Sequence, residues 1–312
     1  MSTALLPSAA RLHWSTLESL PAGASIVIHG TNRKAQLLKS AFEKTRPDIR
    51  IHALVSCDIE DGNKPLPDFV AEYGPCEAVT NQSDWIQTGW RFLDAGCTSL
   101  HVLPVFDASH TKRTCIVIHS ARVIFVPNFK CAYCSFAELF RQKLAEFAGV
   151  RALSEMKSYT DLLDAKYRGF FKFSVVRNPM RRAVSCFKDK YERSEGHPNI
   201  VNWQTPLRRL LGREEISFID WLEFIASMPD EYSDPHWRSQ YYTMHTNDGR
   251  PLVDAVYKLE RLSDHEEELS ERLGVPAQLQ RLNATTPTFE PDSRAVEIAK
   301  RRYEKDFLAF DY

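Results

Sequence analysis

The sequence predicts an α/β protein in which helices flank parallel sheets. Three times along the chain, a short apolar run is followed by a turn and then by an amphipathic helix. The apolar runs begin near residues 25, 123 and 170, and the helices that follow begin near residues 34, 135 and 179. Strands that alternate with helices form parallel sheets, because each strand returns to the same edge through a helical crossover.

Composition indicates a soluble globular protein of one large or two ordinary domains, with 312 residues, 43% hydrophobic and 26% charged. A net charge of −1 gives no global basic field for nucleic acid or an anionic membrane. Seven irregularly spaced cysteines favour free thiols in a reducing cytosol over a disulfide framework. We see no signal-peptide pattern and no apolar run of about 20 residues, so we expect a cytoplasmic protein without stable membrane insertion.

Residues 24–103 contain the first α/β pattern, with strands expected at 25–29, 49–55 and 99–103 and helices at 34–44 and 84–95. This order looks like a Rossmann-type domain, which we place at residues 1–106. The dinucleotide fingerprint G-x-G-x-x-G is missing, because Gly30 is followed by Thr31, Asn32 and Arg33. Asp58, near the usual ribose-binding position, means little alone. We expect a structural, docking or acceptor-orienting role without a dinucleotide, and a linker at residues 105–113.

The second pattern contains a possible anion cradle. After the strand at 123–126 comes a turn with a single lysine, Lys130, and then Ser135 and Glu138 form an S-x-x-E capping box that would open a helix. Backbone N–H groups at a helix N-terminus bind anions, and the helix dipole favours their charge. The cradle is not a Walker loop, since no glycine occurs between Arg113 and Gly149.

The third pattern adds an arginine and a hydroxyl. Arg177 ends a strand, Asn178 is a suitable N-cap, and Pro179 suits the first helical position. One helix face is apolar, and the opposite face carries Arg181, Arg182, Ser185 and Lys188. An arginine fork with a hydroxyl is a good receptor for a phosphate monoester.

Both patterns resemble the phosphate motifs of sulfotransferases. The run Asn128, Phe129, Lys130, Cys131, Ala132, Tyr133, Cys134, Ser135 is similar to N-P-K-x-A-x-[ST]-S, with Phe129 replacing proline and Cys134 replacing a hydroxyl residue. The 3′-phosphate motif V-R-[ND]-P-x-x-R-x-x-S-x-[FY] is matched by Val176, Arg177, Asn178, Pro179, Arg182, Ser185 and Phe187. Three later segments resemble the carbohydrate (family 2) type: 234–241, with Ser239 where proline is common, 256–264, and the terminal Tyr303, Asp306, Phe307, Phe310 and Tyr312.

The resemblance implies that residues 107–312 form a sulfotransferase domain with a P-loop-like fold, a central parallel sheet flanked by helices. It would use 3′-phosphoadenosine 5′-phosphosulfate (PAPS) as donor, release the bisphosphate PAP, and need no metal. Lys130 would neutralise the leaving 5′-phosphate, held by the backbone of Cys131, Ala132, Tyr133, Cys134 and Ser135 and by the Ser135 hydroxyl, while Arg177 and Ser185 would bind the 3′-phosphate. His236 is the leading candidate for general base, because histidine titrates near neutral pH, and Glu260 is its main competitor.

Several alternatives stay open. The acceptor is expected to be a carbohydrate or glycolipid hydroxyl, less favourably an amine; its identity and the oligomeric state are not predicted. Aromatic residues among 192–252 could form core or stack on a sugar: Trp203, Trp221, Trp237, Tyr241 and Tyr242, near Arg208 and Arg209. Cys131-x-x-Cys134 could also be a redox or metal pair. The alternative functions are a catalytically degenerate nucleotide- or glycan-binding protein, and a nucleotide-dependent phosphotransferase, which the missing Walker residues disfavour.

Overall fold

The computed structural model describes residues 11–56, 70, 72–82, 85–103, 115–141, 153–156 (backbone), 165–193, 203–246, 248–277, 279 and 292–312. The chain divides into two units: residues 1–107 with 189–217, and residues 108–188 with 218–312. Residues 189–217, which the sequence prediction assigned to the second domain, group with the first unit. The division into a Rossmann-like domain and a sulfotransferase domain near residue 107 stays a prediction.

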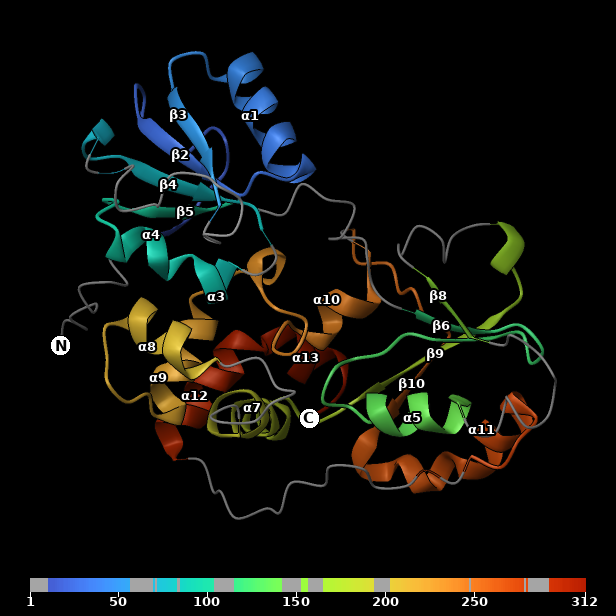
Figure 1. The fold of residues 1–312 in the computed structure, drawn as a ribbon. Helices are drawn as coiled ribbons and strands as arrows, with labels where there is room; N and C mark the ends of the chain where they lie inside the picture. Colours follow the sequence, from blue (N-terminus) through green and yellow to red (C-terminus); the bar gives the residue numbers. More distant parts are fainter. Residues whose placement is uncertain are drawn as a thin grey trace. The chain divides into compact units, whose positions relative to one another are not determined.

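The first unit is built on a parallel sheet (Figure 1). Its five strands lie in the order β1 (Leu12–Trp14), β5 (Leu100–Val102), β4 (Glu77–Thr80), β2 (Ser25–His29) and β3 (Arg50–Val55). All neighbouring strands are parallel. Helix α1 (Arg33–Thr45) begins after Asn32, whose side chain accepts the Ala35 N–H, and buries Ala35, Leu38 and Phe42. The strands at 25–29, 50–55 and 100–102 were predicted; β1 and β4 were not.

The predicted helix over 84–95 is two short helices, α3 (Trp85–Thr88) and α4 (Trp90–Asp94). Gly89 separates them. A Cβ at this position would lie 2.5 Å from the carbonyl oxygen of Trp85 and 2.7 Å from a methyl carbon of Leu100. The close approach to β5 therefore requires glycine. Helix α8 (Gln204–Leu211) also belongs to this unit.

The second unit has a mixed five-stranded sheet in the order β10 (Ala255–Lys258), β9 (Phe171–Val176), β7 (Val123–Phe125), β6 (Cys115–Ile118) and β8 (Leu153–Met156). The first three are mutually parallel, and β6 pairs antiparallel with both β7 and β8. The prediction of an α/β fold with a central parallel sheet flanked by helices is confirmed. The antiparallel strands were not predicted, and residues 105–113, the expected linker, lie outside the described residues.

The helices described in this unit are α5 (Tyr133–Leu139), α7 (Pro179–Phe187), α9 (Phe218–Ala226), α10 (Gln240–Met244), α11 (Glu266–Leu273), α12 (Ser293–Arg302) and α13 (Glu304–Ala309). In Figure 1, α5 and α11 lie beside the sheet, whereas α7, α9 and α12 pack against one another. Helix α7 continues into a π-helical turn (Lys188–Glu192), and short 3₁₀ segments occur at Ala165–Tyr167, Asp230–Tyr232 and Leu259–His265. Phe136 from α5, Leu269 from α11 and Phe173 from β9 share one buried cluster, so α5 and α11 pack on the sheet through it.

Candidate active site

The two predicted phosphate motifs meet at one edge of the sheet. Strands β7, β9 and β10 are parallel neighbours, with Phe125 opposite Phe173 and Val176 opposite Lys258. Residues 126–132 follow β7, Arg177 follows β9, and Glu260 follows β10 within two residues. The carboxyl ends of parallel strands share an edge, where α/β proteins place their ligand sites. Motifs distant in sequence are therefore adjacent in the fold.

The loop after β7 is tied to β9 by side-chain bonds. The Asn128 amide donates to Ser174 Oγ at 3.1 Å and to the Val175 carbonyl at 3.2 Å. Ser174 Oγ donates in turn to the Val126 carbonyl at 2.6 Å. Asn128 and Ser174 are both buried. These bonds fix the path of the chain as it leaves β7 and so the backbone position from which Lys130 follows.

Helix α5 starts two residues before the predicted position. Lys130 and Ala132 adopt left-handed backbone conformations, with φ of 69° and 60°. Ala132 is the N-cap, and its carbonyl accepts the Phe136 N–H at 3.0 Å. The predicted capping box is wrong, because Ser135 lies inside the helix and Glu138 pairs with Arg141 at 2.6 Å. The N–H groups of Cys134 and Ser135 lie in the first turn, where no intrahelical acceptor exists.

The two loop cysteines have opposite environments. Cys131 is buried, its thiol donates to Gln240 Oε1 at 3.2 Å, and burial raises its pKa to about 12. Its backbone N–H donates to the Asn128 carbonyl at 3.2 Å, within the loop. Cys134 is exposed. Within the part of the chain that the structure describes, no three His, Cys, Asp or Glu side chains gather closely enough to hold a metal ion.

The second motif begins as predicted. Asn178 accepts the Arg181 N–H at 3.1 Å as N-cap, and Pro179 is the first helical residue. Burial lowers the pKa of the Arg177 guanidinium, since a desolvated cation is less stable. Ser185, two turns into α7, is also buried. A half-buried arginine thus follows β9 at this edge, and a buried hydroxyl lies on the helix that begins there.

Arg182, which the sequence placed with Arg181, Ser185 and Lys188 on the polar face of the helix, is buried. It is only 1% exposed, and its guanidinium donates to the carbonyls of Phe129 (3.0 Å), Arg238 (2.7 Å) and Pro235 (3.2 Å). A planar guanidinium with several fixed donors suits three converging carbonyls. Arg182 therefore ties α7 to the phosphate loop and to the segment that contains His236.

His236 lies beside the phosphate loop. Its ring centre is 4.6 Å from that of Phe129, the residue before Lys130. Nδ1 lies 2.6 Å from Asp234 Oδ1, which also accepts the His236 backbone N–H at 2.8 Å. Burial opposes ionisation of Asp234, but the His236 contact and the Arg238 charge outweigh it and hold its pKa below the ordinary value. An ionised acceptor at Nδ1 keeps the proton there and leaves Nε2 as a proton acceptor.

The carboxylate of Glu260 has two partners. Oε1 accepts the backbone N–H of Asn178 at 2.9 Å, and Oε2 accepts the Tyr312 hydroxyl at 2.8 Å. Both oxygens thus join β10 to the start of α7 and to the last residue of the chain.

Most of the predicted aromatic candidates are core. Trp221 and Trp237 are each 1% exposed and form an edge-to-face pair at 6.1 Å. Trp203 is also buried. Tyr241 and Tyr242 are half-buried, and Tyr241 stacks on His245 at 3.8 Å. The three tryptophans therefore offer no face to a sugar.

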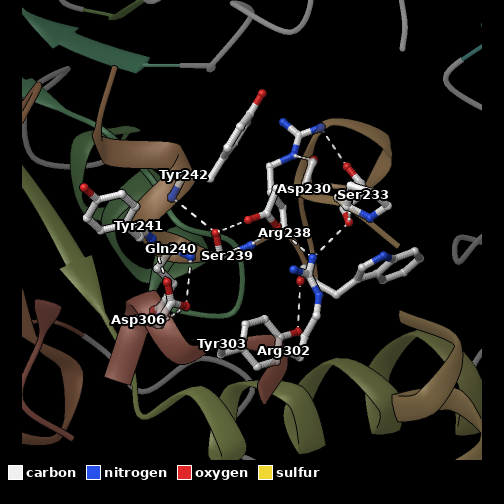
Figure 2. Close-up of polar contacts among 12 residues, drawn as sticks. Asp230, Ser233, Arg238, Ser239, Gln240, Tyr241, Tyr242, Arg302, Tyr303 and Asp306 are labelled. Carbon is white, nitrogen blue, oxygen red and sulfur yellow. Dashed lines mark hydrogen bonds and ion pairs between the residues drawn. The ribbon is translucent and has the colours of Figure 1, made fainter. Parts of the chain in front are cut away.

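A hydrogen-bond network that the sequence analysis did not assign holds the segment after His236 (Figure 2). Asp230 accepts the Ser239 N–H at 2.9 Å and pairs with Arg302 at 2.7 Å. Asp306 accepts the N–H groups of Gln240 (2.9 Å) and Tyr241 (2.7 Å). The Tyr303 hydroxyl donates to the Trp237 carbonyl at 2.9 Å. Tyr303 and Asp306 belong to the terminal motif. The pairing of Asp234 with His236 could have been predicted, because the two residues are only two positions apart in the sequence.

Comparison with known proteins identifies the family. Residues 137–312, more than half of the chain, match the model of the sulfotransferase family. This chain belongs to the sulfotransferase family. It is 27% identical over 179 residues to mouse carbohydrate sulfotransferase 12, a region that covers 48% of this chain and 42% of that protein. The chain thus spans less than half the length of this relative. No solved structure matches it.

The family match includes Arg177, Ser185 and His236 but begins after the loop at 128–135. The assignment of that loop in this sulfotransferase therefore depends on its motif and on its position beside β9. No helix among the described residues is long and apolar enough to cross a membrane.

Proposed function

We propose that this sulfotransferase moves a sulfonate from PAPS to a hydroxyl group of a carbohydrate acceptor. The observation that carries the proposal is the position of His236, whose ring centre lies 4.6 Å from that of Phe129, the residue before Lys130. A histidine with an oriented ring, a loop with a lysine and a half-buried arginine are the groups that in-line sulfonate transfer needs.

The residues fit a donor with two phosphate-like ends. Lys130, the backbone of residues 131–135 and Ser135 would hold the 5′-phosphosulfate, and Arg177 with Ser185 would hold the 3′-phosphate. The half-buried Arg177 charge, whose pKa is lowered by desolvation, gains from an anionic partner. Of the residues 131–135, Cys131 contributes least through its N–H, because that group is already donated to Asn128.

The donor supplies an activated sulfonate whose S–O bond to the 5′-phosphate breaks as a bond to the acceptor oxygen forms. His236 Nε2 accepts the proton that the acceptor hydroxyl loses, and Asp234 stabilises the imidazolium that results. Lys130 neutralises the charge that develops on the departing phosphate oxygens. Glu260 is the weaker candidate for the base, because both of its oxygens already accept hydrogen bonds.

A carbohydrate acceptor is supported by the likeness to a protein named carbohydrate sulfotransferase 12. A hydroxyl is preferred over an amine, because a protonated amine would first have to lose a proton before attacking.

The first test is calorimetric titration of PAP, ATP and NAD into wild type and Arg177→Ala, followed by sulfonate transfer from radiolabelled PAPS to a panel of sugars. We expect PAP alone to bind, with loss of binding in the variant, and transfer that requires Lys130. Binding of ATP or NAD in place of PAP would overturn the donor assignment. Tight PAP binding without transfer to any acceptor would favour a degenerate binding protein.

A further inference from the structure

The side chain of Gln240 touches both phosphate-binding segments. Its Oε1 accepts the Arg177 backbone N–H at 2.8 Å and the Cys131 thiol at 3.2 Å. Its Nε2 donates to the Arg177 carbonyl at 3.0 Å. The residue is fully buried. One side-chain amide therefore bonds both the N–H and the carbonyl of Arg177 and also contacts the loop that contains Lys130.

These two hydrogen bonds to Arg177 lie where the chain changes from strand to helix. Strand β9 ends at Val176, and Asn178 is the N-cap of α7, so Arg177 lies between the two hydrogen-bond patterns. Backbone groups at such a junction need other partners when they are buried. The Gln240 amide supplies both a donor and an acceptor there. It thereby fixes the backbone of Arg177 and the direction in which its side chain leaves the chain.

Asp306 fixes Gln240 in turn (Figure 2). Asp306 Oδ2 accepts the Gln240 backbone N–H at 2.9 Å and Nε2 at 3.2 Å, while Oδ1 accepts the Tyr241 N–H at 2.7 Å. Nε2 thus faces two acceptors, and Oε1 faces two donors. Exchanging the two ends of the amide would place like groups together, so only one orientation satisfies all four contacts.

We propose that Gln240 is the positioning residue for donor selection: it holds Arg177 in the orientation that binds a 3′-phosphate and ties that orientation to the 5′-phosphate loop through Cys131. This inference rests on the proposed function, since it concerns the donor of that same site. Gln240 contacts no reacting atom in this scheme and acts through Arg177.

The test compares two nucleotides that differ only in the 3′-phosphate, PAP and adenosine 5′-monophosphate. Calorimetry on wild type, Arg177→Ala and Gln240→Met gives the ratio of their affinities, which isolates the 3′-phosphate contact. Methionine preserves volume but removes the amide. We expect Gln240→Met to lower the ratio by about tenfold or more, as for a weakened bond to a charged group. The double variant, Arg177→Ala with Gln240→Met, should have the same affinity ratio as Arg177→Ala alone, because both changes act on one contact.

Gln204→Met is the matched control. Gln204 is also buried, and its Nε2 donates to a backbone carbonyl, that of Tyr191, at 2.8 Å. It lies in the other unit, so its loss tests what removal of a buried amide does in general. We expect its PAP-to-monophosphate ratio to equal that of wild type.

The outcomes separate the two proposals. If wild type shows no preference for PAP, the proposed function fails and this inference with it. If wild type and Arg177→Ala behave as expected but Gln240→Met keeps the wild-type ratio, the role of Gln240 is refuted and the proposed function stands. Should Gln240→Met fail to fold, Asp306→Asn decides, because it keeps the shape but replaces one acceptor oxygen with an NH₂ group that faces N–H donors. An unchanged ratio in Asp306→Asn then overturns the inference.

Discussion

Replacing Asp234 with asparagine tests the proposed base most directly. The change preserves the shape of a half-buried side chain and removes the charge that faces His236 Nδ1 at 2.6 Å. The carboxylate is ionised in the native protein, since its pKa is held below the ordinary value by the His236 contact and the Arg238 charge despite burial. The variant therefore removes a charge that is present under any neutral assay condition.

Two bounds give the size of the effect. A hydrogen bond to a charged group contributes about 1.5–3 kcal/mol and a neutral one about 0.5–1.5 kcal/mol, so losing the charge lowers the rate by roughly tenfold. Complete loss of a general base costs about 10²–10⁴-fold. If the asparagine turns its NH₂ toward Nδ1, Nδ1 becomes the acceptor and the ring proton lies on Nε2, where it blocks the proposed base. The loss of rate then approaches the second bound. We expect kcat to fall between these bounds.

The assay is steady-state sulfonate transfer, with PAP binding measured beside it. Asp234→Asn should lower kcat and leave the PAP affinity close to wild type, because the loss concerns the transition state. Asp264→Asn is a suitable control: Asp264 is exposed and pairs with Arg261 at 3.1 Å. A kcat for Asp234→Asn equal to that of the control would refute the role of His236 as an oriented base.

Three further predictions concern the loop and the network around Ser239. Lys130→Ala should lower kcat by about 10²–10³-fold while PAP still binds, measured by initial rates and calorimetry; an unchanged kcat would contradict its role. Asp230→Ala should cost about 3–5 kcal/mol in urea unfolding, because it leaves the buried charge of Arg302 unpaired; a loss below about 1 kcal/mol would count against this. Burial opposes ionisation of Asp230, but Arg302 and Ser239 outweigh burial and lower its pKa. The contribution of the Asp230 charge to the free energy of unfolding is therefore present above about pH 4 and is lost as pH falls through the native pKa. The difference in unfolding free energy between wild type and Asp230→Asn should shrink over that pH range. Iodoacetamide should label Cys134 and spare Cys131, whose pKa is raised to about 12 by burial, and PAP should slow labelling of Cys134; equal labelling of both thiols, or no protection by PAP, would contradict the loop assignment.

Local signals predicted the elements that local physics determines. Strand β2 (Ser25–His29) lies at the predicted residues and helix α1 (Arg33–Thr45) within one residue of them at each end, because an apolar run and a 3.6-residue period need no distant partner to be recognised. Asn178 followed by Pro179 identified the start of α7 for the same reason. The family was likewise readable from motif letters, and the match over residues 137–312 confirms it.

The misses have tertiary causes. Ser135 with Glu138 gave a sound capping signal, yet α5 begins earlier because Ala132 adopts a left-handed conformation that alanine rarely takes. Arg182 lies on the polar face of its helix, but it is buried where it donates to three carbonyls from two other segments. Gln240 and Asp306 were both within recognised motifs, although nothing local indicated that they touch each other.

These contacts give the motif residues a common physical role. The terminal residues Tyr303 and Asp306 bond the segment at 237–241, and Gln240 in that segment bonds Arg177 and Cys131. Tyr303 and Asp306 are therefore linked to the proposed donor site through a short chain of buried hydrogen bonds. Because a partly satisfied buried network is less stable than a complete one, a change at Asp306 should reach Arg177 even though the two side chains belong to different motifs. If the proposed donor site is correct, donor recognition in this sulfotransferase depends on residues that would contact no part of the donor.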